Sequence, residues 1–218
     1  MTSTGFADKT PISRQERLLE IVTVSILAFT ALATAWSGYQ ASLWDGIQSS
    51  NYTQASAART NASQARTEAN QFRLADLGIF EIYVEATMEG NTDVARFFSE
   101  RFRDEFRPAF DAWMALDPLN NIDAPHSPLA MPEYQLAGDA EADQLQAHAE
   151  DLFAAGEDAN STSDIYTLAT LLFAAVLFFA AIAERFEFVR AQIALLVLAG
   201  AGLTVGLVVA LGQPITGG

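Results

Sequence analysis

The sequence predicts an all-α integral membrane protein with three transmembrane helices and one hydrated domain. Three uncharged apolar stretches carry this prediction, namely residues 21–39, 165–183 and 191–211. A helix needs about 20 apolar residues to cross the roughly 30 Å hydrocarbon core of a bilayer. Residues 40–164 hold 22 Asp and Glu against 7 Arg, a net charge of −15, and the rest of the chain sums to zero. The charge imbalance therefore lies in one segment, outside the apolar stretches.

The apolar stretches divide the chain into consecutive segments. These are an N-terminal tail (1–17), a first transmembrane helix (18–40), a hydrated segment (41–164), a second transmembrane helix (165–183), a turn (184–190), a third transmembrane helix (191–211) and a C-terminal tail (212–218). The turn is so short that the second and third helices must form an antiparallel hairpin. Arg14 and Arg17 before the first stretch, with Ala33-Thr34-Ala35 inside it, also fit a cleaved signal peptide. The helical pattern continues past Ala35, which favours an uncleaved anchor.

Basic residues beside the apolar stretches predict the orientation. Lys9, Arg14 and Arg17 precede the first stretch, and Arg185 and Arg190 lie between the second and third. After two crossings, both groups fall on the same side of the membrane. Lys and Arg near the ends of transmembrane helices are retained in the cytoplasm. We therefore expect a protein of the cell membrane with a cytoplasmic N-terminus and with residues 41–164 outside the cytoplasm.

Two rows of small residues at heptad spacing predict a helical stalk in the hydrated segment. The outgoing row consists of Ala55, Ala58, Ala62, Ala65 and Ala69, and we expect Phe72, Ala75, Ile79 and Ile82 to continue it to a stop near Gly90. The returning row consists of Ala142, Leu145, Ala149, Leu152, Gly156, Ala159, Ser163 and Tyr166. Small faces allow close approach, so the two helices are expected to pack as an antiparallel stalk that extends the first two transmembrane helices. The alternative is that one row mediates contacts between subunits.

A short helical tip is expected to cap the stalk, beginning near Thr92. Its aromatic stripe comprises Phe98, Phe102, Phe106, Phe110 and Trp113. Glu100, Arg103, Asp104 and Arg107 are among the charged residues spaced to form ion pairs on the other face. Pro108 is expected to kink the helix or to start a new one. An aromatic stripe more often forms a core than a binding surface. The alternative is that the stripe lines a groove for a partner protein, and the five aromatic residues are then the candidate partner-binding residues.

The sequence offers little that predicts catalysis. His126 and His148 are not in a metal-ligand spacing, and no phosphate loop or nucleophile motif is present. We therefore predict no catalytic residue, no cofactor and no metal site, and a protein that is not an enzyme. The acidic balance disfavours nucleic acid as a partner, because phosphate contacts require clustered Lys and Arg.

Inside the apolar stretches, small residues provide candidate helix-packing faces. Gly202 and Gly206 lie one turn apart in the third stretch, and Ala28, Ala31 and Ala35 form a similar face in the first. Such faces allow helix backbones to approach closely, either within one subunit or between subunits of a homo-oligomer. The apolar stretches contain no Asp, Glu, Lys, Arg or His, which argues against an ion-coupled carrier. A pore built from several subunits stays an alternative.

Three segments carry a resemblance to a known family. They are residues 35–41 (AWSGYQA), 102–113 (FRDEFRPAFDAW) and 127–134 (SPLAMPEY). With these segments the chain resembles an uncharacterised family of prokaryotic three-span membrane proteins with a helical extracytoplasmic domain. The resemblance covers the chain from about residue 18 onward. It implies a prokaryotic, multi-span membrane protein, and it implies no particular activity or catalytic residue.

These observations favour a non-catalytic scaffold or accessory subunit. We expect it to lie in the lipid bilayer and to bind another envelope protein, or further copies of itself, through the extracytoplasmic helical domain. The alternative is a small homo-oligomeric channel or a cation or solute sensor, in which the excess negative charge concentrates cations at an outer vestibule.

Overall fold

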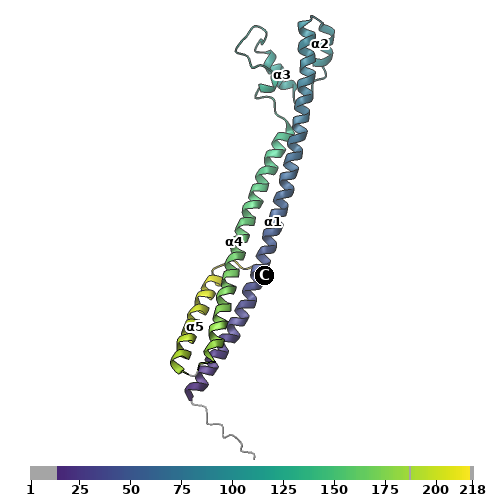
Figure 1. Cartoon of the computed structure of the whole chain (residues 1–218). Helices are drawn as coiled ribbons and strands as arrows, with labels where there is room; N and C mark the ends of the chain where they lie inside the picture. Colours follow the sequence, from purple (N-terminus) through teal and green to yellow (C-terminus); the bar gives the residue numbers. More distant parts are fainter. Residues whose placement is uncertain (1–13, 187, 217–218) are drawn as a thin grey trace, which may run out of the picture. The chain divides into compact units, whose positions relative to one another are not determined.

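The computed structural model describes residues 14–186 and 188–216, and every regular element in these ranges is helical (Figure 1). Most of the predicted N-terminal tail, Glu187 in the predicted turn and the last two residues lie outside the described ranges. The elements are α1 (Arg14–Met88), α2 (Thr92–Ser99), α3 (Arg107–Met114), the short 3₁₀ helix η1 (Pro128–Ala130), α4 (Ala137–Ala183) and α5 (Val189–Leu211).

Three of these helices contain a segment long and apolar enough to cross a membrane. They are α1, α4 and α5, and the apolar segments fall in the three stretches that the sequence singles out. Large apolar side chains such as Leu32 and Val208 are exposed on these segments, as expected for helices that face lipid rather than water. The all-α fold with three candidate transmembrane helices is therefore confirmed.

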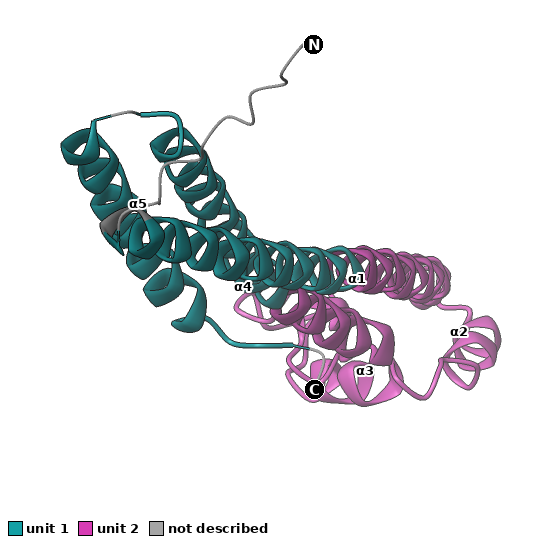
Figure 2. Ribbon diagram, turned by 90° about the horizontal axis from the view of Figure 1, so that it is seen from below, with its two compact units in different colours: residues 1–51, 154–218 teal, residues 52–153 magenta. Residues whose placement is uncertain are grey.

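The chain forms two compact units, to both of which α1 and α4 contribute (Figure 2). The first unit comprises residues 1–51 and 154–218, and the second comprises residues 52–153. The second unit is somewhat shorter than the hydrated segment predicted from the charges. It holds 18 of the acidic residues and all 7 Arg of that segment, so its net charge is −11.

In the first unit, α5 packs closely on the apolar part of α4. A side chain at Gly206 would lie 2.5 Å from Cε1 of the fully buried Phe173, and one at Gly202 would lie 2.9 Å from Cγ2 of Val176. Only glycine permits this approach, which is how small residues stabilise helix pairs in membranes. Gly202 and Gly206 therefore pack within the subunit, which is the first of the two alternatives that their spacing left open.

Within the first unit, hydrogen bonds hold the described part of the C-terminal tail against α1 and α4. The Gln40 side chain pairs with the backbone of Thr216, since Nε2 donates to the carbonyl oxygen at 3.0 Å and the Thr216 N–H donates to Oε1 at 3.1 Å. The indole N–H of Trp44 and the hydroxyl of Tyr166 both donate to the Pro214 carbonyl at 3.1 Å. These contacts satisfy polar groups at the end of the predicted first transmembrane helix.

In the second unit, α1 and α4 pack antiparallel through their small residues. The side chains of Ala55, Ala58, Ala62, Ala65 and Ala69 are all buried, and so are Ala142 and Ala149 of α4. Tyr52 stacks on Phe153 at 5.2 Å, whereas a side chain at Gly138 would lie 3.0 Å from the Ala65 carbonyl oxygen. The two helices therefore run in opposite directions. The small residues of the two predicted rows lie at the contact between them.

The predicted continuation of the α1 row beyond Ala69 is wrong by one position. Phe72, Ala75 and Ile82 are exposed, and the buried residues are Asp76, Phe80 and Ala86. Of the predicted residues, Ile79 is half-buried and packs against the core. A strict heptad from Ala69 reaches residue 76 after seven positions, but an acidic residue was not expected to face the core. The helix ends at Met88 as predicted, and Gly90 supplies the turn with φ of +75°.

The aromatic segment forms two helices, and Pro108 lies at the start of the second, which is one of the two outcomes expected for this proline. The α2 helix begins at Thr92, capped by the Asn91 side chain, and ends at Ser99. Residues 100–106 are irregular, and α3 begins at Arg107 with Pro108 in its first turn. The side-chain ion pairs expected along one helix face do not form, because Arg103 and Arg107 turn to other partners.

Candidate functional site

Four of the five candidate partner-binding residues form the core of the second unit. Phe102, Phe106, Phe110 and Trp113 are buried against Phe80 of α1. Edge-to-face ring pairs connect them, with centroids 4.9 Å apart for Phe102 and Phe106 and 5.4 Å apart for Phe80 and Trp113. Aromatic pairs in this geometry stabilise a core beyond their buried area. These four side chains therefore form a core, which is the interpretation that the sequence favoured, and because they are buried they are not available to a partner as the alternative requires.

The fifth candidate, Phe98, lies outside this core. It is half-buried and pairs edge-to-face with the exposed Phe97 at 5.3 Å. Phe97 in turn lies under the guanidinium of Arg101, whose Cζ is 3.6 Å from the ring centroid. These residues form a small local cluster at the end of α2 rather than an aromatic groove.

A buried carboxylate, missed in the sequence, joins α1 to the irregular segment before α3. Asp76 is 1% exposed, and its Oδ2 accepts hydrogen bonds from Arg103 Nη1 at 3.0 Å and from the Tyr134 hydroxyl at 2.8 Å. Arg103 also pairs with Glu105 and lies 4.1 Å from the centroid of the Phe72 ring. A buried charge is stable only when it is paired and hydrogen-bonded, and Asp76 meets both conditions.

The same network holds the first turn of α4. Glu105 Oε1 accepts a hydrogen bond from the Ala137 N–H at 3.2 Å. Asp139, in the first turn of α4, pairs with Arg73 at 2.5 Å and with Arg66 at 3.4 Å. Carboxylates at a helix N-terminus satisfy its unpaired N–H groups and favour its dipole. Together these contacts fix where α4 begins relative to α1.

The titration of this network fits a structural role. Burial, followed by the hydrogen bond to Asp76, raises the pKa of Tyr134. The hydrogen bond to Asp143 and its negative charge raise the pKa of Arg66. Tyr134 thus stays a neutral donor and Arg66 stays a cation at physiological pH, and neither is suited to act as a general base.

A separate apolar surface lies beside the aromatic core. We call it the Met88 surface and define it by Val84, Met88, Met114, Pro118 and Leu119. Met88 is 75% exposed and Leu119 is 70% exposed. A shallow cavity of about 60 Å³ lies between them, and Tyr83 and Trp113 of the core line it from within. An exposed apolar cluster of this kind is typical of a protein interaction site, and methionine side chains adapt to the shape of a partner.

The surroundings of the Met88 surface are acidic. Glu85 directly follows Val84 and Glu89 directly follows Met88 in the sequence, and Asp117 precedes Pro118. The arginines of the second unit all have contacts of their own. Arg66, Arg73, Arg96 and Arg103 are in ion pairs, Arg59 and Arg101 lie over aromatic rings, and Arg107 donates to two carbonyl oxygens. The uncompensated charge of the unit therefore favours a basic partner.

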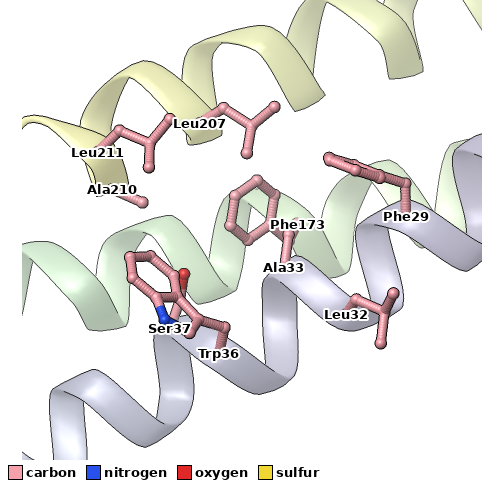
Figure 3. Close-up of a pocket in the computed structure, with 9 residues that line it drawn as sticks. All are labelled: Phe29, Leu32, Ala33, Trp36, Ser37, Phe173, Leu207, Ala210 and Leu211. Carbon is pink, nitrogen blue, oxygen red and sulfur yellow. The ribbon is translucent and has the colours of Figure 1, made fainter. Parts of the chain in front are cut away.

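A second cavity lies in the first unit, between the apolar parts of α1, α4 and α5 (Figure 3). Its volume is about 240 Å³, and it is lined by Phe29, Leu32, Ala33, Trp36, Ser37, Phe173, Leu207, Ala210 and Leu211. We call it the intramembrane cleft. The Ser37 hydroxyl is its one side-chain oxygen, and the rest of its lining is almost entirely apolar.

The two histidines do not contribute to either cavity. His126 is exposed in the connector between α3 and η1, and His148 is exposed on α4. Within the described ranges, no group of three or more His, Asp or Glu side chains is placed to hold a metal ion.

Comparison with known proteins gives no match to a family model, to a curated protein or to a solved structure.

Proposed function

We propose that this chain is a non-catalytic scaffold or accessory subunit of a prokaryotic cell membrane. The apolar parts of α1, α4 and α5 anchor it, with the N-terminus in the cytoplasm and residues 41–164 outside. The antiparallel parts of α1 and α4 form a stalk beyond the membrane, and α2, α3 and the connector form its cap. The cap binds another envelope protein.

The observation that carries this proposal is the exposure of the Met88 surface. Met88 and Leu119 leave most of their apolar area in contact with water although a packed aromatic core lies directly beneath them. Burying that area against a partner is favourable by about 25 cal/mol per Å². The partner is expected to present apolar side chains surrounded by Lys or Arg, because charge complementarity speeds and orients association with an acidic domain.

Site-specific photo-crosslinking tests this assignment in the full chain in its native membrane. A photoreactive residue at Leu119 should give one crosslinked protein in high yield. Leu74 is the matched control, because it is a leucine on α1 with nearly equal exposure, 68% against 70%, and lies outside the Met88 surface. Equal crosslinking at both positions, or crosslinking only between copies of the chain, would refute a partner site at the Met88 surface.

A further inference from the structure

The intramembrane cleft combines an apolar lining with one buried hydroxyl that lacks a partner. Ser37 is fully buried, and its Oγ has no hydrogen-bond partner. Thr23 and Thr34 of α1 donate to the carbonyl four residues earlier, at 2.8 and 2.7 Å. The buried Thr30 hydroxyl also lacks a partner, but Thr30 does not line the cleft, so Ser37 is the unpaired hydroxyl at this site. In Figure 3 the Ser37 side chain lies among the cleft-lining residues, beside Trp36. An unpaired hydroxyl in an apolar site is unfavourable, so the site favours a ligand with a hydrogen-bond acceptor.

The cleft is accessible from the side that faces lipid. Phe29, Leu32 and Leu211 line it, and all three are exposed on the surface of the first unit. Its volume of about 240 Å³ lies between that of a small cavity that binds benzene, about 150 Å³, and that of a site for a drug-sized molecule, about 300–1,000 Å³. This size suits one hydrocarbon chain.

The depth of Ser37 identifies the type of acceptor. Ser37 lies three residues before the end of the predicted first transmembrane helix, which is about 5 Å along the helix axis. Phe29 lies eight residues deeper, or about 12 Å. The acceptor therefore sits where the hydrocarbon core meets the headgroup region, which is the depth of the ester carbonyl groups of a glycerolipid. The apolar part of the cleft runs inward from there.

A second helix is a poorer occupant than a lipid chain. Membrane helices pack closely through small residues, whereas Phe29, Leu32 and Trp36 line the α1 side of the cleft. The small residues Ala28, Ala31 and Ala35 are exposed on a different face of α1. A flexible chain can lie between large side chains that would hold a helix backbone away.

We propose that the intramembrane cleft binds one acyl chain of a membrane glycerolipid, whose ester carbonyl oxygen accepts a hydrogen bond from the Ser37 hydroxyl. The binding is non-covalent and uses the leaflet next to the end of the first transmembrane helix that leads into the second unit. This inference does not depend on the Met88 surface or on the identity of its partner.

The test titrates detergent-solubilised full-length protein with a phosphatidylcholine that carries bromine on its acyl chain. Bromine quenches tryptophan fluorescence on contact, and Trp36 lines the cleft. The titration uses the Trp44→Phe background, in which the other tryptophan, Trp113, is buried in the core of the second unit. The proposal predicts quenching that saturates at about one lipid per chain, and native mass spectrometry should detect one retained lipid.

Two matched variants test the location. Ala33→Phe fills the cleft and should abolish saturable quenching and lipid retention, whereas Ala35→Phe places the same side chain on the exposed face of α1 and should leave both unchanged. Quenching that rises without saturation and equally in all variants would overturn the proposal. A change in oligomeric mass on Ala33→Phe alone would also overturn it, because a second copy would then occupy the cleft.

A third variant tests the hydrogen bond without filling the cleft. Ser37→Ala should weaken binding of the ester lipid by about 3- to 10-fold, while the lipid-free protein keeps its stability because no hydrogen bond is lost there. A lipid with ether-linked chains lacks the carbonyl oxygen and should bind the wild type as weakly as the ester lipid binds Ser37→Ala. Equal affinity of the wild type for ester and ether lipids would overturn the role of Ser37.

Discussion

Replacing Gly206 with alanine should weaken the packing of α5 on α4, whereas the same change at Gly200 should not. The new Cβ at position 206 would lie 2.5 Å from Cε1 and 2.9 Å from Cδ1 of the buried Phe173, so the ring must shift and lose part of its packing. At Gly200 a Cβ would meet no atom within 4 Å. Both changes gain up to about 1 kcal/mol of helix propensity. The difference between them therefore isolates overpacking, which costs about 1–3 kcal/mol.

The assay is unfolding of full-length protein in mixed micelles by a denaturing detergent, followed by Trp36 fluorescence. Trp36 packs against the cluster that contains Phe173 and Ala210, so its environment changes when α4 and α5 separate. Gly206→Ala should unfold at a lower detergent fraction than Gly200→Ala. Equal midpoints, or a more stable Gly206→Ala, would refute the close packing of α4 and α5.

Three further perturbations test the second unit and the C-terminal tail. Arg103→Met removes the ion-pair partner of the buried Asp76 and leaves it the hydrogen bond from Tyr134, so it should destabilise the second unit by about 3–5 kcal/mol, measured by denaturation with Trp113 fluorescence. The pKa of Tyr134 is raised in the folded protein. The Tyr134 hydroxyl therefore contributes its full stabilisation below the pKa of about 10 that tyrosine has in the unfolded chain, and this stabilisation is lost as the pH rises above that value. Tyr134→Phe should thus lose less stability at alkaline pH than the wild type. Gln40→Ala removes the acceptor of the Thr216 N–H and should speed hydrogen exchange at that amide.

Arg101→Met is the matched control for Arg103→Met, because Arg101 contacts Phe97 on the surface. Equal losses of stability in the two variants would show that the ion pair with Asp76 contributes no more than a surface contact. The same alkaline stability profile for Tyr134→Phe and the wild type would exclude the role of the tyrosine hydroxyl. Unchanged exchange at Thr216 would mean that the tail is not held by Gln40.

The sequence alone predicts those parts of the fold that depend on a repeating pattern of neighbouring residues. The alanines from Ala55 to Ala69 repeat at heptad spacing, and the structure buries them. The apolar stretches are long enough to define three candidate transmembrane helices without further information. The stop at Gly90 follows from the backbone freedom of glycine, which the observed φ of +75° uses.

The parts that were missed depend on contacts between distant residues. Asp76 faces the core because Arg103, 27 residues away, and Tyr134, 58 residues away, complete its hydrogen bonds. The ion pairs predicted along one helix face fail for the same reason, since Arg103 pairs with Asp76 instead.

The aromatic stripe forms a core, as its spacing favoured, and the exposed apolar surface of the second unit lies on other residues. The aromatic stripe identified hydrophobic side chains correctly, but Phe102 and Phe106 are used for the core. The exposed residues Met88 and Leu119 come from the end of α1 and from the connector after α3, and no single segment of sequence shows that they share one surface.

The most direct test of the proposed function is the mass and composition of the complex extracted gently from native membranes, compared between the wild type, Leu119→Asp and Leu74→Asp. We predict a stoichiometric second polypeptide bound to the wild type and to Leu74→Asp. Its affinity for Leu119→Asp should fall at least about tenfold, because a charge would replace an apolar anchor. A closed ring of identical subunits in all three proteins, with no second polypeptide, would contradict the scaffold account and favour the channel.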